Sequence, residues 1–313
     1  KHGKPAGYRE MVEGDDYFYD KNGIANYVAD WDVAGIMFND ATPSQNHTLS
    51  ISGSTAKTNY YMSVGYNYEQ GLLQFNPEKL NKYTATLNVS SQVADWLQVG
   101  ARVNYSENKY DYPYVRQNTY QYMWRWGSFF GPWGFIRDEN GDAYDARQAI
   151  GYRKTAGDAN TKYHNLRLGA FMKANIVKGL TLNADYTYTF KNTTYKGVGL
   201  SPVLWNTWGL TNTIAPSDMG SSTFVETDRS NTNNYVANIY GNYEYKLNDR
   251  HNFNLMAGFN VDEQEYEYLY YENHDILDNN MPELALTPTF YSYSHSHTHQ
   301  GSAGFFARLN YNF

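Results

Sequence analysis

Apolar and polar residues alternate along most of this chain. From Thr181 to Phe190 every even position is apolar and every odd position is Thr, Asn or Asp. Because successive side chains of a strand point to opposite faces, this segment predicts a strand with one apolar and one polar face. The same pattern recurs in nine segments. They are residues 45–55, 59–69, 83–93, 97–109, 163–176, 180–192, 233–247, 252–270 and 302–313.

The connections between these segments alternate between short and long. Residues 56–58, 94–96, 177–179 and 248–250 are the short links, and residues 71–82, 110–162, 193–232 and 271–301 are the long ones. Outer-membrane barrels have short periplasmic turns and long extracellular loops. The pattern therefore predicts an all-β, antiparallel up-and-down transmembrane β-barrel. Its apolar face is expected to meet lipid and its polar face to line the lumen.

Two regions are expected along the chain. Residues 1–44 lack clean alternation and are predicted to be an extracellular loop region that leads into the barrel. Residues 45–313 are predicted to be a partial transmembrane barrel, truncated at both ends. The chain begins at Lys1 without a signal peptide, and its last strand is still alternating at Phe313. We interpret the sequence as an internal piece of a longer protein.

Composition narrows the class of protein. A mean hydropathy of -0.70 excludes a helical membrane protein but not a barrel, whose strands hide half of their residues from lipid. The net charge of -7 and the absence of a Lys/Arg stripe argue against a nucleic-acid partner. The chain has no cysteine, no G-x-S-x-G, no H-E-x-x-H and no phosphate-binding glycine loop. We therefore expect neither an enzyme nor a cofactor.

Motifs in the first third of the chain resemble one family. They are Asp30-Trp31, the stretch TPSQNHTLSISG at residues 42–53, the KTNY hairpin at residues 57–60 and the DWLQVG turn at residues 95–100. Their order resembles the early barrel of SusC/RagA-type TonB-dependent transporters of Bacteroidetes. The match is specific over residues 30–105, and the later strands agree in style.

The resemblance implies a 22-stranded barrel in the outer membrane of a Gram-negative bacterium, of which this chain holds fewer than half of the strands. It also implies an N-terminal plug pulled by TonB and a SusD-like surface lipoprotein over the extracellular loops. The implied function is import of oligomeric nutrients, with glycans expected in preference to peptides. A surface receptor or adhesin barrel and a passive porin-like channel are the alternatives.

Tryptophans supply the candidate substrate-binding residues. Five of them fall in two long connections: Trp124, Trp126, Trp133, Trp205 and Trp208. Flat aromatic rings can stack on sugars and also suit peptide side chains, so we expect these rings to help form a platform at the outer mouth. Each ring could instead belong to the interfacial aromatic girdle or pack the loops together. Trp96, beside a short turn, is assigned to the girdle.

Charged residues on the polar side of the strands are the second set of candidates. Arg102, Arg167 and Asp185 are expected to face the lumen and to line the route of the substrate. Selectivity in such a pore follows from its width and from the hydrogen-bonding groups on its wall.

Metal binding is weighed at three places and assigned at none. His295, His297 and His299 would share one face of a strand, which suits a borderline metal, but a polar strand end facing the lumen explains them equally. Residues 138–149 lack the Gly and the Glu of an EF-hand loop. The carboxylates within residues 13–20 are expected to be solvated loop charges.

Overall fold

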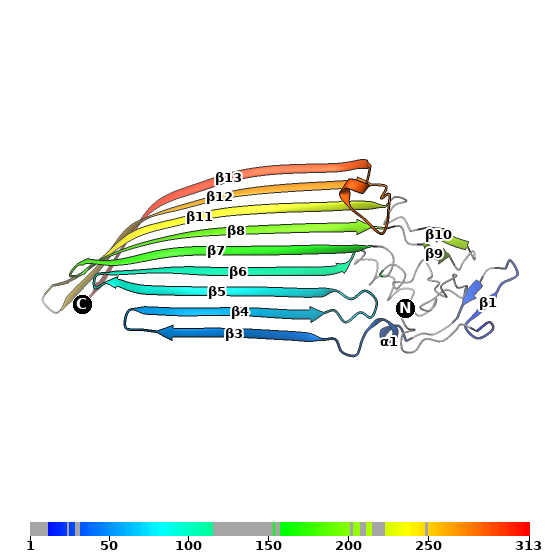
Figure 1. Cartoon of the computed structure of the whole chain (residues 1–313), viewed down its shortest axis with the longest axis horizontal. Helices are drawn as coiled ribbons and strands as arrows, with labels where there is room; N and C mark the ends of the chain where they lie inside the picture. The colour runs from blue at the N-terminus through cyan, green and yellow to red at the C-terminus, as the bar shows by residue number, and fades with distance from the viewer. Residues whose placement is uncertain are drawn as a thin grey trace.

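The computed structural model describes residues 12–23, 25–28, 32–114, 153, 157–200, 203–206, 211–214, 223–247 and 250–313. Its main body is a nine-stranded antiparallel sheet in the order β13-β12-β11-β8-β7-β6-β5-β4-β3 (Figure 1). Each strand pairs with the large strands that precede and follow it in the chain. The prediction of an all-β up-and-down sheet that forms part of a barrel is therefore confirmed.

The bounds of the elements are as follows. The sheet comprises β3 (Ser44–Ser54), β4 (Thr58–Gln70), β5 (Lys79–Ala94), β6 (Leu97–Pro113), β7 (Asp158–Val177), β8 (Leu180–Gly199), β11 (Phe224–Leu247), β12 (His251–His274) and β13 (Thr289–Asn312). The smaller elements are β1 (Tyr17–Tyr19), β2 (Ala25–Tyr27), α1 (Val33–Met37), β9 (Val203–Asn206), β10 (Thr211–Ile214) and the 3-10 helix η1 (Leu284–Leu286). Within the described ranges, no helix has the length and apolar character needed to cross a membrane.

The nine predicted strands are all present, but most are longer than predicted. Their ends at the short turns agree with the prediction to within one residue. At the other end β8 continues to Gly199, β11 already begins at Phe224, and β13 begins at Thr289 rather than at residue 302. These extensions pair through their backbones without an apolar face, so a search for apolar alternation assigned them wrongly to the long connections.

Strand length grows across the sheet, from 11 residues in β3 to 24 in β11, β12 and β13. Much of the growth occurs at the short-turn end. Thr58, which begins β4, pairs with Ser91 before β5 ends, and Leu180, which begins β8, pairs with Tyr243 before β11 ends. At the opposite end, the ends of neighbouring strands differ by at most two residues. A stagger of this kind is the shear that tilts the strands of a barrel.

The two ends of the sheet differ in kind. Figure 1 shows tight turns at one end, and α1, β1, β9 and β10 beyond the other. At that second end a small apolar core forms where α1 meets the β4–β5 connection. Met37 and Leu73 are each 3% exposed there, and the backbone amide of Asn39 donates to the carbonyl of Leu72. The segregation of short and long connections predicted from the sequence is thus present in the fold.

Candidate functional site on the polar face of the sheet

One face of the sheet is apolar across several neighbouring strands. Ala184, Ile239, Phe259 and Phe305 pair directly across β8, β11, β12 and β13, so their side chains lie on the same side. Phe305 is 89% exposed and Ile239 is 54% exposed. A large exposed apolar surface marks contact with lipid or with another protein. We call this side the apolar face.

Aromatic rings border the apolar face at both ends. Toward the long connections, the ring centroids of Tyr188 and Tyr235 are 5.1 Å apart. Toward the short turns, those of Phe253 and Tyr311 are 5.0 Å apart, and Trp96 stands exposed in the β5–β6 turn. Membrane barrels carry girdles of aromatic residues at both interfaces. The two borders have the composition of such girdles.

The opposite side, which we call the polar face, contains a hollow of about 570 Å³. Arg102, Arg167 and Asp185, the three residues predicted to line the lumen, all contribute to its wall from β6, β7 and β8. Further polar residues of the lining are Gln98, Asn104, Lys173, Asn183 and Thr187. We call this site the basic hollow, because it contains three cationic side chains and one carboxylate.

Glycines shape the basic hollow. Gly169 pairs with Arg102 on one side and with Thr187 on the other, so its missing side chain leaves the floor bare. A Cβ on Gly100 would collide with the ring of Phe171, which crosses from the neighbouring strand. The guanidinium carbon of Arg102 lies 4.9 Å from the centroid of that ring, in cation–π contact. The absence of a side chain at Gly100 therefore makes room for the ring that supports Arg102.

A row of hydrogen-bonded side chains runs from the basic hollow across the polar face. Asn238 Nδ2 donates to Asp185 Oδ1 at 2.8 Å, and Asn260 Nδ2 donates to Asn238 Oδ1 at 2.6 Å. Such cross-strand pairs contribute to the stability of a sheet. They also give each polar side chain a hydrogen-bond partner within the protein. Asp185 is therefore held in place by β11.

Nearer the long connections, the polar face becomes acidic and rich in tyrosine. The Tyr195 hydroxyl donates to Glu226 Oε1 at 2.6 Å. The Tyr270 hydroxyl lies 3.2 Å from Glu226 Oε2 and 2.6 Å from Glu272 Oε2. Burial, and next the negative charge of Glu226, raises the pKa of Tyr114, which follows the end of β6. We call these residues the acidic mouth, and its charge is opposite in sign to that of the basic hollow.

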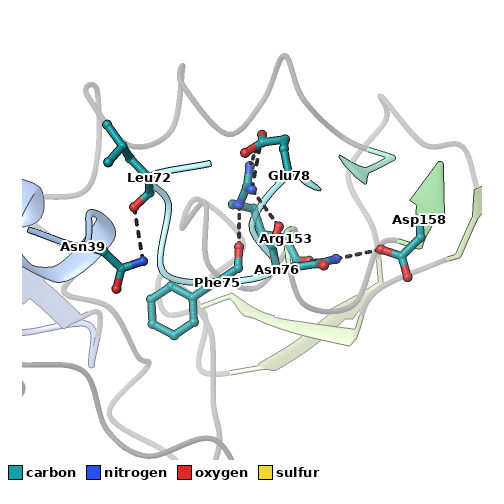
Figure 2. A network of polar contacts seen from close by, with 7 residues as sticks. All are labelled: Asn39, Leu72, Phe75, Asn76, Glu78, Arg153 and Asp158. Atoms are coloured by element: carbon teal, nitrogen blue, oxygen red, sulfur yellow. Dashed lines mark hydrogen bonds and ion pairs between the residues drawn. The ribbon is translucent and has the colours of Figure 1, made fainter. Parts of the chain in front are cut away.

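Beside the acidic mouth, a buried arginine fastens two connections together (Figure 2). Arg153 Nε donates to the carbonyl of Phe75 and Nη2 to that of Asn76, each at 2.8 Å, and Nη2 lies 3.4 Å from Glu78 Oε1. Asn76 Nδ2 donates in turn to Asp158 Oδ1 at 2.6 Å. Carbonyls and a carboxylate together allow the guanidinium to be buried without an uncompensated charge. The contact joins the β6–β7 connection to the β4–β5 connection.

The tryptophans predicted to bind substrate stay a prediction. Trp124, Trp126, Trp133 and Trp208 lie outside the described residues. Trp205 belongs to β9, where its backbone pairs with Asn212 of β10, and its side chain lies outside the description.

The histidine tract lies on β13, on the same side as the apolar face. His295, His297 and His299 share the parity of Phe305, so they lie on the side of the sheet opposite the polar face. His299 Nε2 lies 2.8 Å from Glu263 Oε1, a carboxylate supplied by β12. Among the described residues, no group of three or more His, Cys, Asp or Glu is placed to hold a metal ion.

One of the N-terminal carboxylates differs from its expectation. Asp16 is 3% exposed, and its Oδ2 accepts a hydrogen bond of 2.8 Å from the backbone amide of Val12. The prediction of a solvated charge is therefore wrong for this residue, because its side chain closes the turn that precedes β1. Residues 138–149 lie outside the described part of the chain.

Sequence reasoning missed the acidic mouth and the arginine contact. Tyr195 and Glu226 lie in segments that lack apolar alternation and were therefore assigned to loops. One signal was available, because the polar-face parity of β12 continues through Tyr266, Tyr268 and Tyr270 to Glu272. No local pattern marks Arg153, whose partners lie about 75 residues earlier in the chain.

The fold is shared with solved structures of a transporter. The structure of the RagAB peptide transporter matches with a TM-score of 0.68 and 20% identity, over 91% of this chain and 32% of the other. The RagAB peptide importer in the "closed-closed" state matches with a TM-score of 0.71 and 18% identity, over 92% and 32%. In the "open-open" state the values are 0.70 and 18%, over 86% and 30%.

At this level of identity the likeness establishes the barrel fold. This chain spans about a third of the length of the structures it matches. No family model and no curated protein matches it. The motifs of residues 30–105 resemble those of the SusC/RagA family, and the fold of the chain resembles that of the RagAB structures. The similar structures are transporters rather than enzymes.

Proposed function

We propose that this chain forms part of the wall of a SusC/RagA-type, TonB-dependent importer of oligomeric nutrients in the outer membrane of a Gram-negative bacterium. The observation that carries the proposal is a nine-stranded meander with one apolar and one polar face, in a chain whose early strands carry the family's motifs. The apolar face meets lipid, and the aromatic borders lie at the two membrane interfaces.

In this proposal the polar face lines the lumen. Arg102, Arg167 and Asp185 lie on the wall of the transport route, and the barrel moves substrate without making or breaking a bond. Residues 1–44 and the long connections lie outside the cell, beneath a SusD-like lipoprotein. The plug and the TonB contact come from another part of the whole protein.

Two substrate classes are supported by different observations. The five loop tryptophans favour oligosaccharides, because aromatic faces suit sugar rings. The fold favours oligopeptides, because the similar structures are of a peptide transporter and importer.

Uptake by cells that express the whole protein and its lipoprotein tests the function. We expect labelled oligosaccharides or oligopeptides to accumulate, and accumulation to stop when TonB is deleted. Uptake that persists without TonB would indicate a passive channel. Surface binding without uptake would indicate a receptor or adhesin.

Replacing the three tryptophans of the β6–β7 connection tests the platform. We expect Trp124→Ala, Trp126→Ala and Trp133→Ala together to weaken ligand binding by about tenfold or more, since a stacked aromatic ring contributes about 0.5–1.5 kcal/mol and tenfold is about 1.4 kcal/mol. Isothermal titration of the purified whole transporter measures the affinity. An unchanged affinity removes these rings from the site.

A further inference from the structure

The basic hollow contains cationic groups that this part of the protein does not neutralise. Among the described residues, no carboxylate lies within ion-pair distance of Arg102, Arg167 or Lys173. Asp185, the one carboxylate of the lining, accepts its hydrogen bond from Asn238. The hollow therefore carries a net positive charge, and the other polar side chains of its lining are neutral amides and hydroxyls.

The geometry of the hollow suits a small anion. Arg102 is supported by the Phe171 ring, which holds the guanidinium beside the bare floor at Gly169. Arg167 stands two residues along β7 from Gly169, and Lys173 stands four residues along in the other direction. A planar guanidinium held in place binds a carboxylate through two parallel hydrogen bonds. A volume of about 570 Å³ leaves room for the group that bears the carboxylate.

The acidic mouth limits which anions can arrive. Glu226 and Glu272 lie on the same polar face, closer to the long connections, and would repel a polyanion. They would attract an ammonium group. The distance from the mouth to the hollow can be counted along β8. Gly197 pairs with Glu226 of the mouth, and Thr189 pairs with Arg167 of the hollow. These two residues of β8 are eight positions apart. At about 3.3 Å per residue this is roughly 26 Å, the reach of an extended peptide of about eight residues.

We propose that the basic hollow, with Arg102, Arg167 and Lys173, is a carboxylate-binding site for the C-terminal end of an oligopeptide in transit. The proposal rests on the proposed import function and narrows it to a dipolar substrate. The acidic mouth attracts the amino end, and the basic hollow receives the carboxyl end. No covalent step is involved.

The test compares two forms of one octapeptide, with a free C-terminal carboxylate and with a C-terminal amide. Binding to the whole purified transporter with its lipoprotein is measured by isothermal titration at low and at physiological salt. The variants are Arg102→Gln, Arg167→Gln and Lys173→Gln, singly and together. Lys191→Gln is the matched control, because it removes the same charge from the polar face of β8 outside the hollow.

We expect the triple variant to bind the free-acid peptide about tenfold more weakly, as the loss of a few partly screened charge pairs predicts. The amide form and the Lys191→Gln control should be unaffected. Asp185→Asn, which removes the only carboxylate of the hollow, should bind the free acid more tightly. Salt should reduce the difference between the two peptides.

A second variant keeps the proposal testable if the triple variant fails to fold. A Cβ on Gly169 would lie 3.7 Å from Arg102 Cβ and from Thr187 Oγ1, which are ordinary contacts. Gly169→Ala should therefore fold and raise the floor without changing any charge. We expect about threefold weaker binding of the free acid, with the amide unchanged.

Three outcomes overturn the inference. Equal affinity of the wild type for acid and amide removes the carboxylate site. If the triple variant loses the same affinity for both peptides, these cations bind another part of the protein rather than the peptide carboxylate. A loss confined to an acidic oligosaccharide, such as an oligogalacturonate, assigns the hollow to glycans. The proposed function fails separately, when no probe enters cells in a TonB-dependent manner.

Discussion

Phe171 lies across Gly100 because position 100 has no side chain, and the same arrangement occurs elsewhere on the sheet. A Cβ on Gly258 would collide with the Phe306 ring, and one on Gly53 with Tyr60. An aromatic ring that covers a neighbouring glycine supplies the packing that glycine lacks. At the scale of single residues, these glycines are therefore fixed by the rings of the next strand rather than by turns.

Gly100→Ala tests this dependence. We expect the free energy of unfolding of the whole barrel to fall by about 1–3 kcal/mol, because the new methyl group overlaps the Phe171 ring. Arg102 should also lose its support. The free energy is measured by unfolding in urea, with the folded fraction read from the different gel mobilities of the folded barrel and the heat-unfolded chain.

Gly241→Ala is the control for that substitution. A Cβ there would meet only the Thr181 carbonyl oxygen, at 4.0 Å. Its stability should match the wild type to within about 0.5 kcal/mol. If both variants unfold at the same urea concentration as the wild type, the ring does not depend on Gly100.

At the scale of elements, successive residues of each strand alternate between the apolar face and the polar face of the sheet. Ile239 lies on the apolar face of β11, whereas Asn242, three residues along the same strand, lies on the polar face. The alternation that predicted β11 follows this division, and under the proposed function it stops where the strand leaves the membrane.

Lysine substitutions at these two positions should have different effects. We expect Ile239→Lys to destabilise the folded barrel in lipid by about 2–4 kcal/mol, because a charge near the midplane of the bilayer is costly. Asn242→Lys should change stability little. Refolding titrations into vesicles measure both, and equal losses would contradict the assignment of the two faces.

The connections are held by side-chain contacts between distant residues rather than by strand pairing. Arg153 reaches back to carbonyls of the β4–β5 connection, and its loss would leave the carbonyls of Phe75 and Asn76 without their donors. We expect Arg153→Ala to loosen residues 71–78 by about 1–3 kcal/mol, as for other buried groups left unsatisfied. Hydrogen exchange of these amides should speed up accordingly.

Arg250→Ala, which removes an exposed arginine at the opposite end of the sheet, is the matched control. Exchange of residues 71–78 should not change in it. Unchanged exchange in Arg153→Ala would show that the β4–β5 connection does not depend on Arg153.

The sequence predicted this fold in part, and the physical reason is visible in the elements. The short-turn ends were predicted to within a residue, because the apolar alternation continues up to each tight turn. The part of β13 before residue 302 was missed, because histidine replaces the apolar residue of the alternating pattern at positions 295, 297 and 299. Backbone pairing there needs no apolar face, so composition carries little signal.

At the scale of the whole molecule, the candidate site joins residues that are distant in the chain. The sequence placed Arg102, Arg167 and Asp185 on the polar side by parity alone. It could not show that they share one hollow, since that depends on the registers of β6, β7 and β8. The support of Arg102 by Phe171 likewise depends on register, and so escaped prediction.

The charge of the polar face changes from negative at the acidic mouth to positive at the basic hollow. This change should affect the rate at which charged peptides enter. We expect Glu226→Gln to raise the initial uptake rate of an acidic peptide by about twofold to fivefold at low salt, because one repelling charge leaves the mouth. A neutral peptide should enter at the wild-type rate. Glu267→Gln on the other face is the control, and an effect that persists at 1 M salt would contradict an electrostatic cause.

The growth of the strands from β3 to β13 gives the wall two different edges. At the short turns the edge is stepped: Leu180, the first residue of β8, pairs with Tyr243, so β11 runs four residues, roughly 13 Å, further. At the long connections β8, β11, β12 and β13 finish level, so this part of the rim is even. Glu226 and Glu272 lie two residues inside that even rim, so a ligand meets their charge as soon as it crosses the rim.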